Sequence, residues 1–165
     1  MKPTEGVQIR RMTAADLERV LAIAQNLPLA PHWPQSAWLK AINSQFEPES
    51  TPRRIALVAA NPQPGSILGF AVASLLPPQA ELETIAVAPE SQRIGLGERI
   101  FQALAAELKA AGVNELVLEV RASNRPALAF YRTLGFVKTA VRPGYYVDPI
   151  EDAVLMHFLP ADNLS

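Results

Sequence analysis

The chain has 165 residues, of which 49% are hydrophobic, and its formal net charge at pH 7 is −1. This length and composition predict a single domain with one core, which we place at residues 1–160 and follow with a short tail at 161–165. The near-neutral charge gives no electrostatic reason to expect nucleic acid or a membrane surface as a partner. No cysteine occurs, which excludes disulfides and thiolate chemistry.

The two histidines, His32 and His157, lie far apart in the sequence and lack the spacing of a metal-binding motif, so we expect no metal. The opening residues, MKPTEGVQIRR, contain no apolar stretch of the signal-peptide type. No apolar run approaches the about 20 residues that a membrane-spanning helix needs. We therefore expect a cytoplasmic protein.

The first predicted elements are a strand at residues 7–11 and an amphipathic helix. The helix starts at Thr13, and Asp16 stands three residues later, where it completes a capping pattern. Its apolar stripe consists of Leu17, Val20, Leu21, Ala24 and Leu27. Pro34 opens a second short helix, which carries Trp38.

The middle of the chain is rich in β-branched and apolar residues, and it predicts three strands in quick succession after a polar, proline-broken loop. The first two strands flank the turn NPQPG and form a hairpin. These strands are expected at residues 54–60, 66–76 and 80–87.

The last part of the chain alternates between helical and strand patterns. A helix at 96–111 ends at Gly112, and a second helix starts at Ser123 or Asn124 and ends at Gly135. The accompanying strands are expected at residues 115–120, 136–141 and 153–158. This order of elements predicts an α/β fold in which helices cover both faces of a mixed sheet.

The stretch SQRIGLGERI, residues 91–100, places two glycines just before a predicted helix. Helix N-termini leave backbone N–H groups without partners, and glycines let an anion approach them, so this corner suits a phosphate. A plain strand-to-helix turn is the simpler interpretation. The Walker A pattern is absent because no lysine follows either glycine, and the dinucleotide fingerprint fails because Ile100 takes its third glycine position. A third pattern, Q/R-x-x-G-x-G/A, is fully matched from Gln92 to Gly97.

This matched loop, after the strand ETIAV and before a helix, resembles the acyl-CoA pyrophosphate loop of the GCN5-related N-acetyltransferases (GNAT). The stretches LEVRASNRPALAFYRTLGF (118–136) and RPGYYVDPIEDAVLMHF (142–158) resemble the ribosomal-protein-alanine N-acetyltransferases, and PHW (31–33) stands where that family has a Pro-Trp loop. The resemblance extends over residues 7–158 and is strongest after residue 83. It implies the GNAT fold, with a mixed sheet of about seven strands that splays between the fourth and fifth strands.

The resemblance also implies acetyl-CoA as co-substrate. Its pyrophosphate is expected at the glycine corner, and its pantetheine arm is expected to pair with strand backbone where neighbouring strands diverge. The backbone N–H of Val87 is expected to polarise the thioester carbonyl. The implied cofactor contacts are Ile85, Ala86, Val87, Gln92, Arg93, Ile94, Gly95, Leu96, Gly97, Glu98 and Asn124.

Transfer of an acetyl group to an amine needs a base and an acid. Glu119 interrupts the apolar strand LVLEV, and Tyr131 lies on the helix that follows. Simpler interpretations are a solvated edge position for Glu119, a core aromatic for Tyr131 and a helix cap for Asn124. The resemblance implies that Glu119 is the proton acceptor, that Tyr131 is the proton donor and that Asn124 contacts the cofactor. A tyrosine hydroxyl with an ordinary pKa of about 10 is neutral at pH 7 and has a proton to give.

The acceptor side rests on the resemblance. The residues implied for peptide binding are Trp33, Tyr145 and Tyr146, with the two tyrosines expected between the last two strands. Glu81, Glu83 and Arg142 are candidates to assist acceptor binding, but they are more simply interpreted as exposed strand charges. The loop departs from the family pattern at Pro143-Gly144 and Val147-Asp148-Pro149, where a more polar stretch is expected.

Three functions remain open at this stage. The leading hypothesis is acetylation of a protein N-terminus, above all the N-terminal alanine of a small-subunit ribosomal protein, by a monomer or weak homodimer. The second is acetylation of a small-molecule amine, which the lack of an acidic cluster beyond Glu81 and Glu83 disfavours. The third is a non-catalytic acyl-CoA-binding module, which would need the glycine loop but neither Glu119 nor Tyr131.

Overall fold

The computed structural model describes residues 6–27, 33–47, 53–62 and 66–159. The expected tail at 161–165 therefore lies outside the described residues, as do Pro31 and His32 of the Pro-Trp loop. Seven strands form one sheet in the order β1-β2-β3-β4-β5-β7-β6, as expected for a mixed sheet. The strands are β1 Gln8–Arg11, β2 Arg53–Ala60, β3 Ile67–Leu76, β4 Gln79–Val87, β5 Glu115–Arg121, β6 Val137–Tyr146 and β7 Glu151–Phe158.

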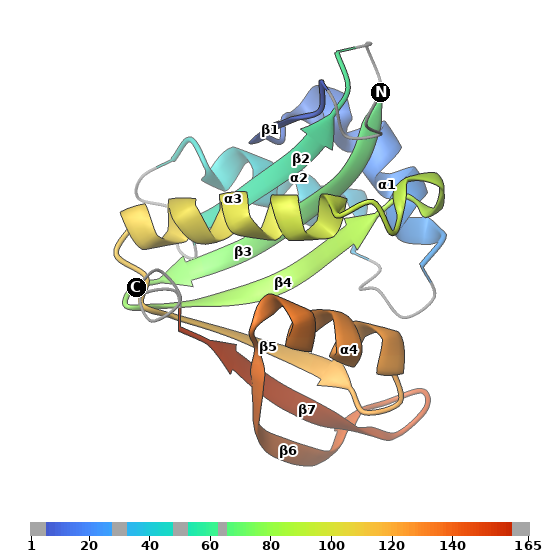
Figure 1. Cartoon of the computed structure of the whole chain (residues 1–165), viewed down its shortest axis with the longest axis vertical. Coiled ribbons are helices and arrows are strands. Elements are labelled where there is room, and N and C mark those ends of the chain that lie inside the picture. Colours follow the sequence, from blue (N-terminus) through green and yellow to red (C-terminus); the bar gives the residue numbers. More distant parts are fainter. Residues whose placement is uncertain (1–5, 28–32, 48–52, 63–65, 160–165) are drawn as a thin grey trace.

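The helices cover the two faces of the sheet unequally (Figure 1). In this view α3 and α4 lie in front of the sheet, whereas α1 and α2 lie behind its upper half. The four α-helices are α1 Leu17–Gln25, α2 Gln35–Ser44, α3 Leu96–Ala110 and α4 Arg125–Leu134. Two short 3-10 turns, Ala14–Asp16 and Pro89–Ser91, precede α1 and α3. Among the described residues no helix is both long and apolar enough to cross a membrane.

Strands β1 to β4 are antiparallel, and the two central ones, β2 and β3, are buried from both sides. Because side chains of a strand alternate between faces, β2 sends Ile55 and Leu57 toward α3, and Ala56 and Val58 toward α1 and α2. The cluster on the second side ends at Ala88 and includes no residue of β5, β6 or β7. We call the two sides the α3 face and the α1/α2 face.

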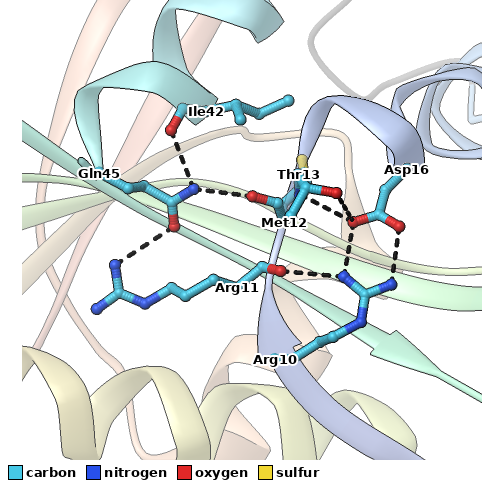
Figure 2. A network of polar contacts seen from close by, with 7 residues as sticks. All are labelled: Arg10, Arg11, Met12, Thr13, Asp16, Ile42 and Gln45. Atoms are coloured by element: carbon cyan, nitrogen blue, oxygen red, sulfur yellow. Dashed lines mark hydrogen bonds and ion pairs between the residues drawn. The ribbon is translucent and has the colours of Figure 1, made fainter.

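A polar network joins β1 to α1 and α2 (Figure 2). The buried Asp16 carboxylate accepts two hydrogen bonds from Arg10, at 2.7 and 2.8 Å, and one from the Thr13 backbone N–H, which confirms the predicted capping pattern. Buried Gln45 donates to the carbonyl oxygen of Met12, at 3.1 Å. Its amide oxygen accepts from the backbone N–H of β2. The network fixes the corner where the chain leaves the sheet edge.

A β-bulge in β4 exchanges the two faces of that strand. Val72 of β3 pairs with Thr84, but its neighbour Ala73 pairs with Leu82, so Glu83 is an extra residue. Before the bulge, Leu82 packs on the α3 face, and after it Ala86 packs on the α1/α2 face. The strand also bends here, which is the usual effect of a bulge.

Beyond the bulge the sheet splays. Strand β4 is parallel to β5, and the two pair only from Gln79–Glu81 to Glu115–Val117, after which they diverge. Strands β5 and β7, and then β7 and β6, are antiparallel. Helix α4 covers this second half on the α3 face, and none of its residues is fully buried. We call the opposite side of β5, β7 and β6 the open face.

The structure corrects one expectation about the acceptor region. Tyr145 and Tyr146 do not lie between the last two strands, because β6 continues to Tyr146. The pattern Pro-Gly suggested a turn, yet Gly144, with φ +62°, sits in an irregular stretch of β6 where its N–H donates to the Asp152 carboxylate at 2.9 Å. The chain reverses only after Tyr146, at residues 147–150.

Candidate active site

The glycine corner is the start of α3. Gly95 caps the helix with φ +80°, a left-handed conformation that suits glycine, and Arg93 also has a positive φ of 66°. The first helical bond runs from Arg99 N–H to the Gly95 carbonyl oxygen, so the preceding N–H groups have no acceptor within the helix. A side-chain atom added at Gly95 would meet nothing within 4 Å. The corner therefore presents amides and the positive end of a helix to open space.

The other residues of the corner divide into packing and polar positions. Leu96 is buried in the core and Ile94 packs against it, so these two offer backbone groups rather than side chains. Gln92 donates its side-chain amide to the Val87 carbonyl oxygen at 3.0 Å, which ties the corner to the end of β4. Glu98 stands in the first turn of α3, where a carboxylate interacts favourably with the helix dipole.

Gly97 sets the distance between α3 and α4. An added Cβ would lie 2.9 Å from Cζ of Phe130 on α4, closer than side chains pack. The absence of a side chain at Gly97 thus lets the aromatic ring of α4 rest on the first turn of α3. This contact places α4 beside the glycine corner.

The free edge of β4 leads from this corner into the splay. Ala88 N–H donates to the Leu68 carbonyl oxygen, at 2.7 Å, which sets the alternation of the antiparallel ladder with β3. Ala86 then directs its backbone groups toward β3, while those of Ile85 and Val87 point away from it. Because β5 has diverged, no neighbouring strand pairs with Ile85 and Val87, although the Val87 carbonyl oxygen accepts the bond from Gln92.

Helix α4 begins at this edge. Asn124 caps it, accepting a hydrogen bond from Ala127 N–H at 3.3 Å, so its simpler role as a cap is confirmed. Tyr131 packs against Phe130 and Phe136, with ring centroids 5.9 and 5.8 Å away. Burial, together with nearby Tyr146, raises the pKa of Tyr131 to about 12, so its hydroxyl keeps its proton at neutral pH.

Glu119 approaches the splay from the other side of the sheet. Leu118 and Val120 of β5 pack on the α3 face, and Glu119 between them faces the open face. Its side chain is 25% exposed, and Oε1 lies 3.4 Å from the Arg142 guanidinium. Burial and the charge of Glu119 raise the pKa of Tyr146, which in turn interacts with Tyr131. Tyr146 thus stands within electrostatic reach of the two candidate catalytic groups.

Sequence reasoning missed the role of Arg121. Its guanidinium lies 4.4 Å above the Tyr146 ring, and it also pairs with Glu151 at 3.5 Å. The signal was present, because Arg121 shares the period-two face of Glu119 on the same strand. What the sequence did not reveal was that β6 would bring Tyr146 to this face.

Two more carboxylates lie on the α1/α2 face of β4. Glu83, at the bulge, receives two hydrogen bonds from Arg54, the closer at 2.7 Å. Burial and the negative charges of Glu83 and Glu119 together raise the pKa of Glu81. Glu81 therefore belongs to the electrostatic surroundings of Glu119, which its interpretation as a simple exposed charge did not indicate.

Trp33 lies at a distance along the chain from these groups. Its ring packs against Trp38 with centroids 4.7 Å apart, and Trp38 in turn meets Phe70 edge-on at 5.5 Å. Trp33 is half-buried on the α1/α2 face. In the described part of the chain, no cluster of histidine and acidic side chains is suited to a metal ion.

The comparisons with known proteins agree with this geometry. The model of the acetyltransferase (GNAT) family matches residues 19–136. The chain belongs to this family. It is 44% identical over 96 residues to the [ribosomal protein bS18]-alanine N-acetyltransferase of Escherichia coli K12, an alignment that covers 57% of this chain and 65% of that enzyme.

A longer alignment relates the chain to the corresponding enzyme of Haemophilus influenzae, with 35% identity over 151 residues, 90% of this chain and 95% of that one. In three dimensions the chain resembles the crystal structure of the ribosomal-protein-S18-alanine N-acetyltransferase from Escherichia coli. The TM-score is 0.75 at 34% sequence identity, and 93% of each chain is covered. The predicted GNAT fold, splayed between the fourth and fifth strands, is thereby confirmed.

Proposed function

We propose that this protein transfers the acetyl group of acetyl-CoA to the N-terminal α-amino group of a protein, and that its acceptor is the alanine that begins a small-subunit ribosomal protein. The observation that carries the proposal is the divergence of β4 from β5. It leaves the edge of β4 free from the N-terminus of α3 onward, with Glu119 on one face of the sheet and Tyr131 on the other. The named relatives act on the alanine of ribosomal protein bS18, which supports this acceptor.

The residues present fit coenzyme A. The open space at Gly95 and the unpaired N–H groups of α3 suit its pyrophosphate, and the free edge at Ile85 and Val87 suits its amide-bearing arm. Asn124, which uses its side-chain oxygen to cap α4, keeps its amide N–H groups for a further contact. Bound there, acetyl-CoA supplies an acetyl group activated as a thioester.

Glu119 would serve the acceptor side. An N-terminal amine attacks only as the free base, and with an ordinary pKa of about 8 it arrives mostly protonated. Glu119 faces the open face, where an extended peptide end has access, and its carboxylate takes the proton from the nitrogen directly or through a water molecule.

Tyr131 would serve the leaving side. Its phenol, with a pKa of about 12, stays neutral throughout the physiological range and holds a proton for the departing sulfur. Because Glu119 and Tyr131 stand on opposite faces of the sheet, proton removal and proton donation happen on opposite sides of the reacting centre. The orientation of the two partners supplies much of the remaining rate enhancement.

The acceptor peptide is expected to lie on the open face against Tyr145 and Tyr146. The two rings meet edge-on, with centroids 5.1 Å apart. Trp33 is the expected contact from the α1/α2 face. A small first residue such as alanine suits a site enclosed by aromatic side chains.

The test is a thiol-release assay with acetyl-CoA and short peptides. Because the chain contains no cysteine, the enzyme adds no background to a thiol reagent. We expect release with peptides that begin with alanine, and none with the same peptide acetylated beforehand. Release only with spermidine or an aminoglycoside would instead identify a small-molecule acceptor, and binding of coenzyme A without turnover of any acceptor would identify a binding module.

A further inference from the structure

We propose that Arg142 and Tyr145 are positioning residues that together hold the Glu119 carboxylate, ionised and at a fixed place, on the open face. The inference rests on the proposed function, in which Glu119 accepts the proton of the acceptor amine. It adds two residues that act through Glu119 rather than on the acetyl group. We call Arg142 and Tyr145 the β6 clamp.

The contacts of the clamp converge on one carboxylate. Arg142 Nη1 lies 3.4 Å from Glu119 Oε1. The interaction of the Tyr145 hydroxyl with Glu119, through hydrogen bonding and the negative charge of the carboxylate, raises the pKa of Tyr145. The Arg142 guanidinium also lies 5.6 Å from the centre of the Tyr145 ring, so the two members of the clamp contact each other.

Arg142 reaches Glu119 across an intervening strand. The strand order places β7 between β5 and β6, so β5 and β6 lie about 10 Å apart. Arg142 pairs with Ala153 of β7, whereas Glu119 pairs with Leu155, two residues further along β7. The long arginine side chain therefore reaches the carboxylate diagonally across β7.

The irregularity in β6 brings Tyr145 to the same face. In a regular strand, Arg142 and Tyr145 would point to opposite faces because their separation is an odd number of residues. Between the pairs Arg142–Ala153 and Tyr146–Glu151, however, β6 has two more residues than β7. The Gly144 N–H bond to Asp152 anchors this bulge, and Gly144 has the positive φ that the bend requires.

The charges around Glu119 explain why a clamp would matter. Glu81 faces it from β4, and the repulsion between these two carboxylates is one cause of the raised pKa of Glu81. Arg142 is the cation in contact with Glu119, and Tyr146 from β6 is a neutral neighbour. Arg142 therefore offsets the negative charge of Glu81 beside the Glu119 carboxylate.

The first test reads the protonation of Glu119 directly, without turnover. Carbon-13 NMR of the glutamate carboxyl groups, with the Glu119 signal assigned by its absence in E119Q, follows its titration in wild type, R142M and Y145F. We expect titration at higher pH in both variants, because each substitution removes a group that interacts with the Glu119 carboxylate. Lys138→Met is the matched control, since Lys138 lies on β6 but pairs with Met156, which faces the α3 side. An unchanged Glu119 titration in R142M and Y145F overturns the inference.

The second test uses kinetics with an alanine-starting peptide. R142M is expected to lower kcat/KM about 3- to 10-fold below neutral pH, to recover at alkaline pH and to leave KM for acetyl-CoA unchanged. R142K should recover part of the loss. In the E119Q background R142M should have no further effect on kcat/KM. A loss of kcat/KM that is equal at every pH and persists in the E119Q background would mean that Arg142 acts independently of Glu119, and it would overturn the clamp.

The two levels of the proposal fail differently. A wild-type protein that acetylates no peptide refutes the proposed function, and the carboxyl titration then decides by itself whether the clamp exists. If the enzyme is active but its Glu119 titration is the same in wild type, R142M and Y145F, the proposed function stands and the β6 clamp is refuted.

Discussion

The two halves of the sheet are built for different purposes. Strands β1 to β4 lie between α3 on one face and α1 and α2 on the other, and most residues of β2 and β3 are inaccessible to solvent. Strands β5, β7 and β6 have only α4 on one face, and nine of the ten residues of β6 are exposed. The first half therefore supplies most of the burial that stabilises the fold, and the second supplies accessible polar side chains.

The candidate site lies at the seam between these halves. The seam is weakly joined, since β4 and β5 pair over only three positions before they diverge. A splayed seam exposes backbone groups that a continuous sheet would pair, and this is the feature that a strand-like ligand can use. The comparison predicts that changes in the first half cost stability, whereas changes around the open face cost activity.

The largest expected effect is on activity. Glu119→Gln keeps the size of the side chain but removes the proton acceptor, so kcat should fall about 100- to 10,000-fold. The unfolding midpoint and the affinity for acetyl-CoA should stay within experimental error of the wild type. Glu18→Gln, an exposed position on α1, is the control with the same change of charge. Parallel loss of activity and acetyl-CoA binding would show that Glu119 is structural.

The next effect contrasts the two halves in stability. Leu57 of β2 is 1% exposed in the core under α3, so Leu57→Ala should lower the free energy of unfolding by about 2–5 kcal/mol. Leu155 of β7 lies opposite Glu119 on the open face and is only partly buried, so Leu155→Ala should cost about 1 kcal/mol. Urea unfolding of both variants measures the difference. Equal losses would contradict the division between the halves.

A third prediction concerns the contact between α3 and α4 at the seam. Gly97→Ala puts a Cβ 2.9 Å from the Phe130 ring, so we expect a loss of about 1–3 kcal/mol in unfolding free energy. It should also weaken acetyl-CoA binding, because the first turn of α3 has to shift. In an F130A background, Gly97→Ala should lower the free energy of unfolding much less. If the losses from the two substitutions simply add, the clash between the Cβ and the Phe130 ring is excluded.

A fourth, smaller effect tests the corner at β1 that Figure 2 shows. Burial acts to raise the pKa of Asp16, but hydrogen bonds from Arg10 and Thr13 outweigh it and hold the pKa below its ordinary value of 3.8. A lowered pKa means that the ionised carboxylate stabilises the fold above that value and that this contribution disappears as the pH falls. Asp16→Ala should therefore cost about 1–2 kcal/mol near pH 7. The gap to wild type should narrow as the pH falls from about 5 toward 2 in urea titrations, and a constant gap would contradict the role of the charge.

The smallest effect is spectroscopic. Because the pKa of Tyr131 is raised from 10.0 to about 12, its ionisation should be the latest of the three tyrosines and should be missing in Tyr131→Phe. Ultraviolet absorbance of tyrosinate follows this titration directly. The raised value means that the neutral phenol stabilises the fold up to pH 10 and that this advantage declines toward pH 12. A Tyr131 that ionises at the same pH as the exposed Tyr145 would contradict its buried environment.

Much of the fold could be predicted from local patterns. Thr13 and Asp16, Gly112 and Asn124 mark helix ends by capping chemistry that depends only on neighbouring residues, and alternation in β1 and apolar runs in β2 and β5 placed their strands. The incorrect placement of Tyr145 and Tyr146 between the last two strands also came from a local sequence pattern. Pro143 and Gly144 are locally typical of a turn, but pairing with β7 and the bond to Asp152 keep this stretch within β6.

The site was only partly predictable. Gln92 to Gly97 and Glu119 stood out because each breaks a local pattern, whereas Tyr131 was singled out by the resemblance, which also assigned the roles of all of them. Arg142 was set aside as an exposed charge because its partner is 23 residues away in the sequence and two strands away in space. Glu81 was undervalued for the same reason.

The sequence by itself determined which segments become helices and strands, where α3 and α4 begin, and that a glycine corner stands at the mouth of α3, because all of these follow from interactions among residues close together in the chain. Only the tertiary structure decided that Glu83 would bulge and exchange the faces of β4, that β4 and β5 would part after three paired positions, and that Arg142 would reach across β7 to Glu119. These depend on the register between strands and on what covers each face of the sheet, and pairing over such distances leaves no periodic trace in the sequence.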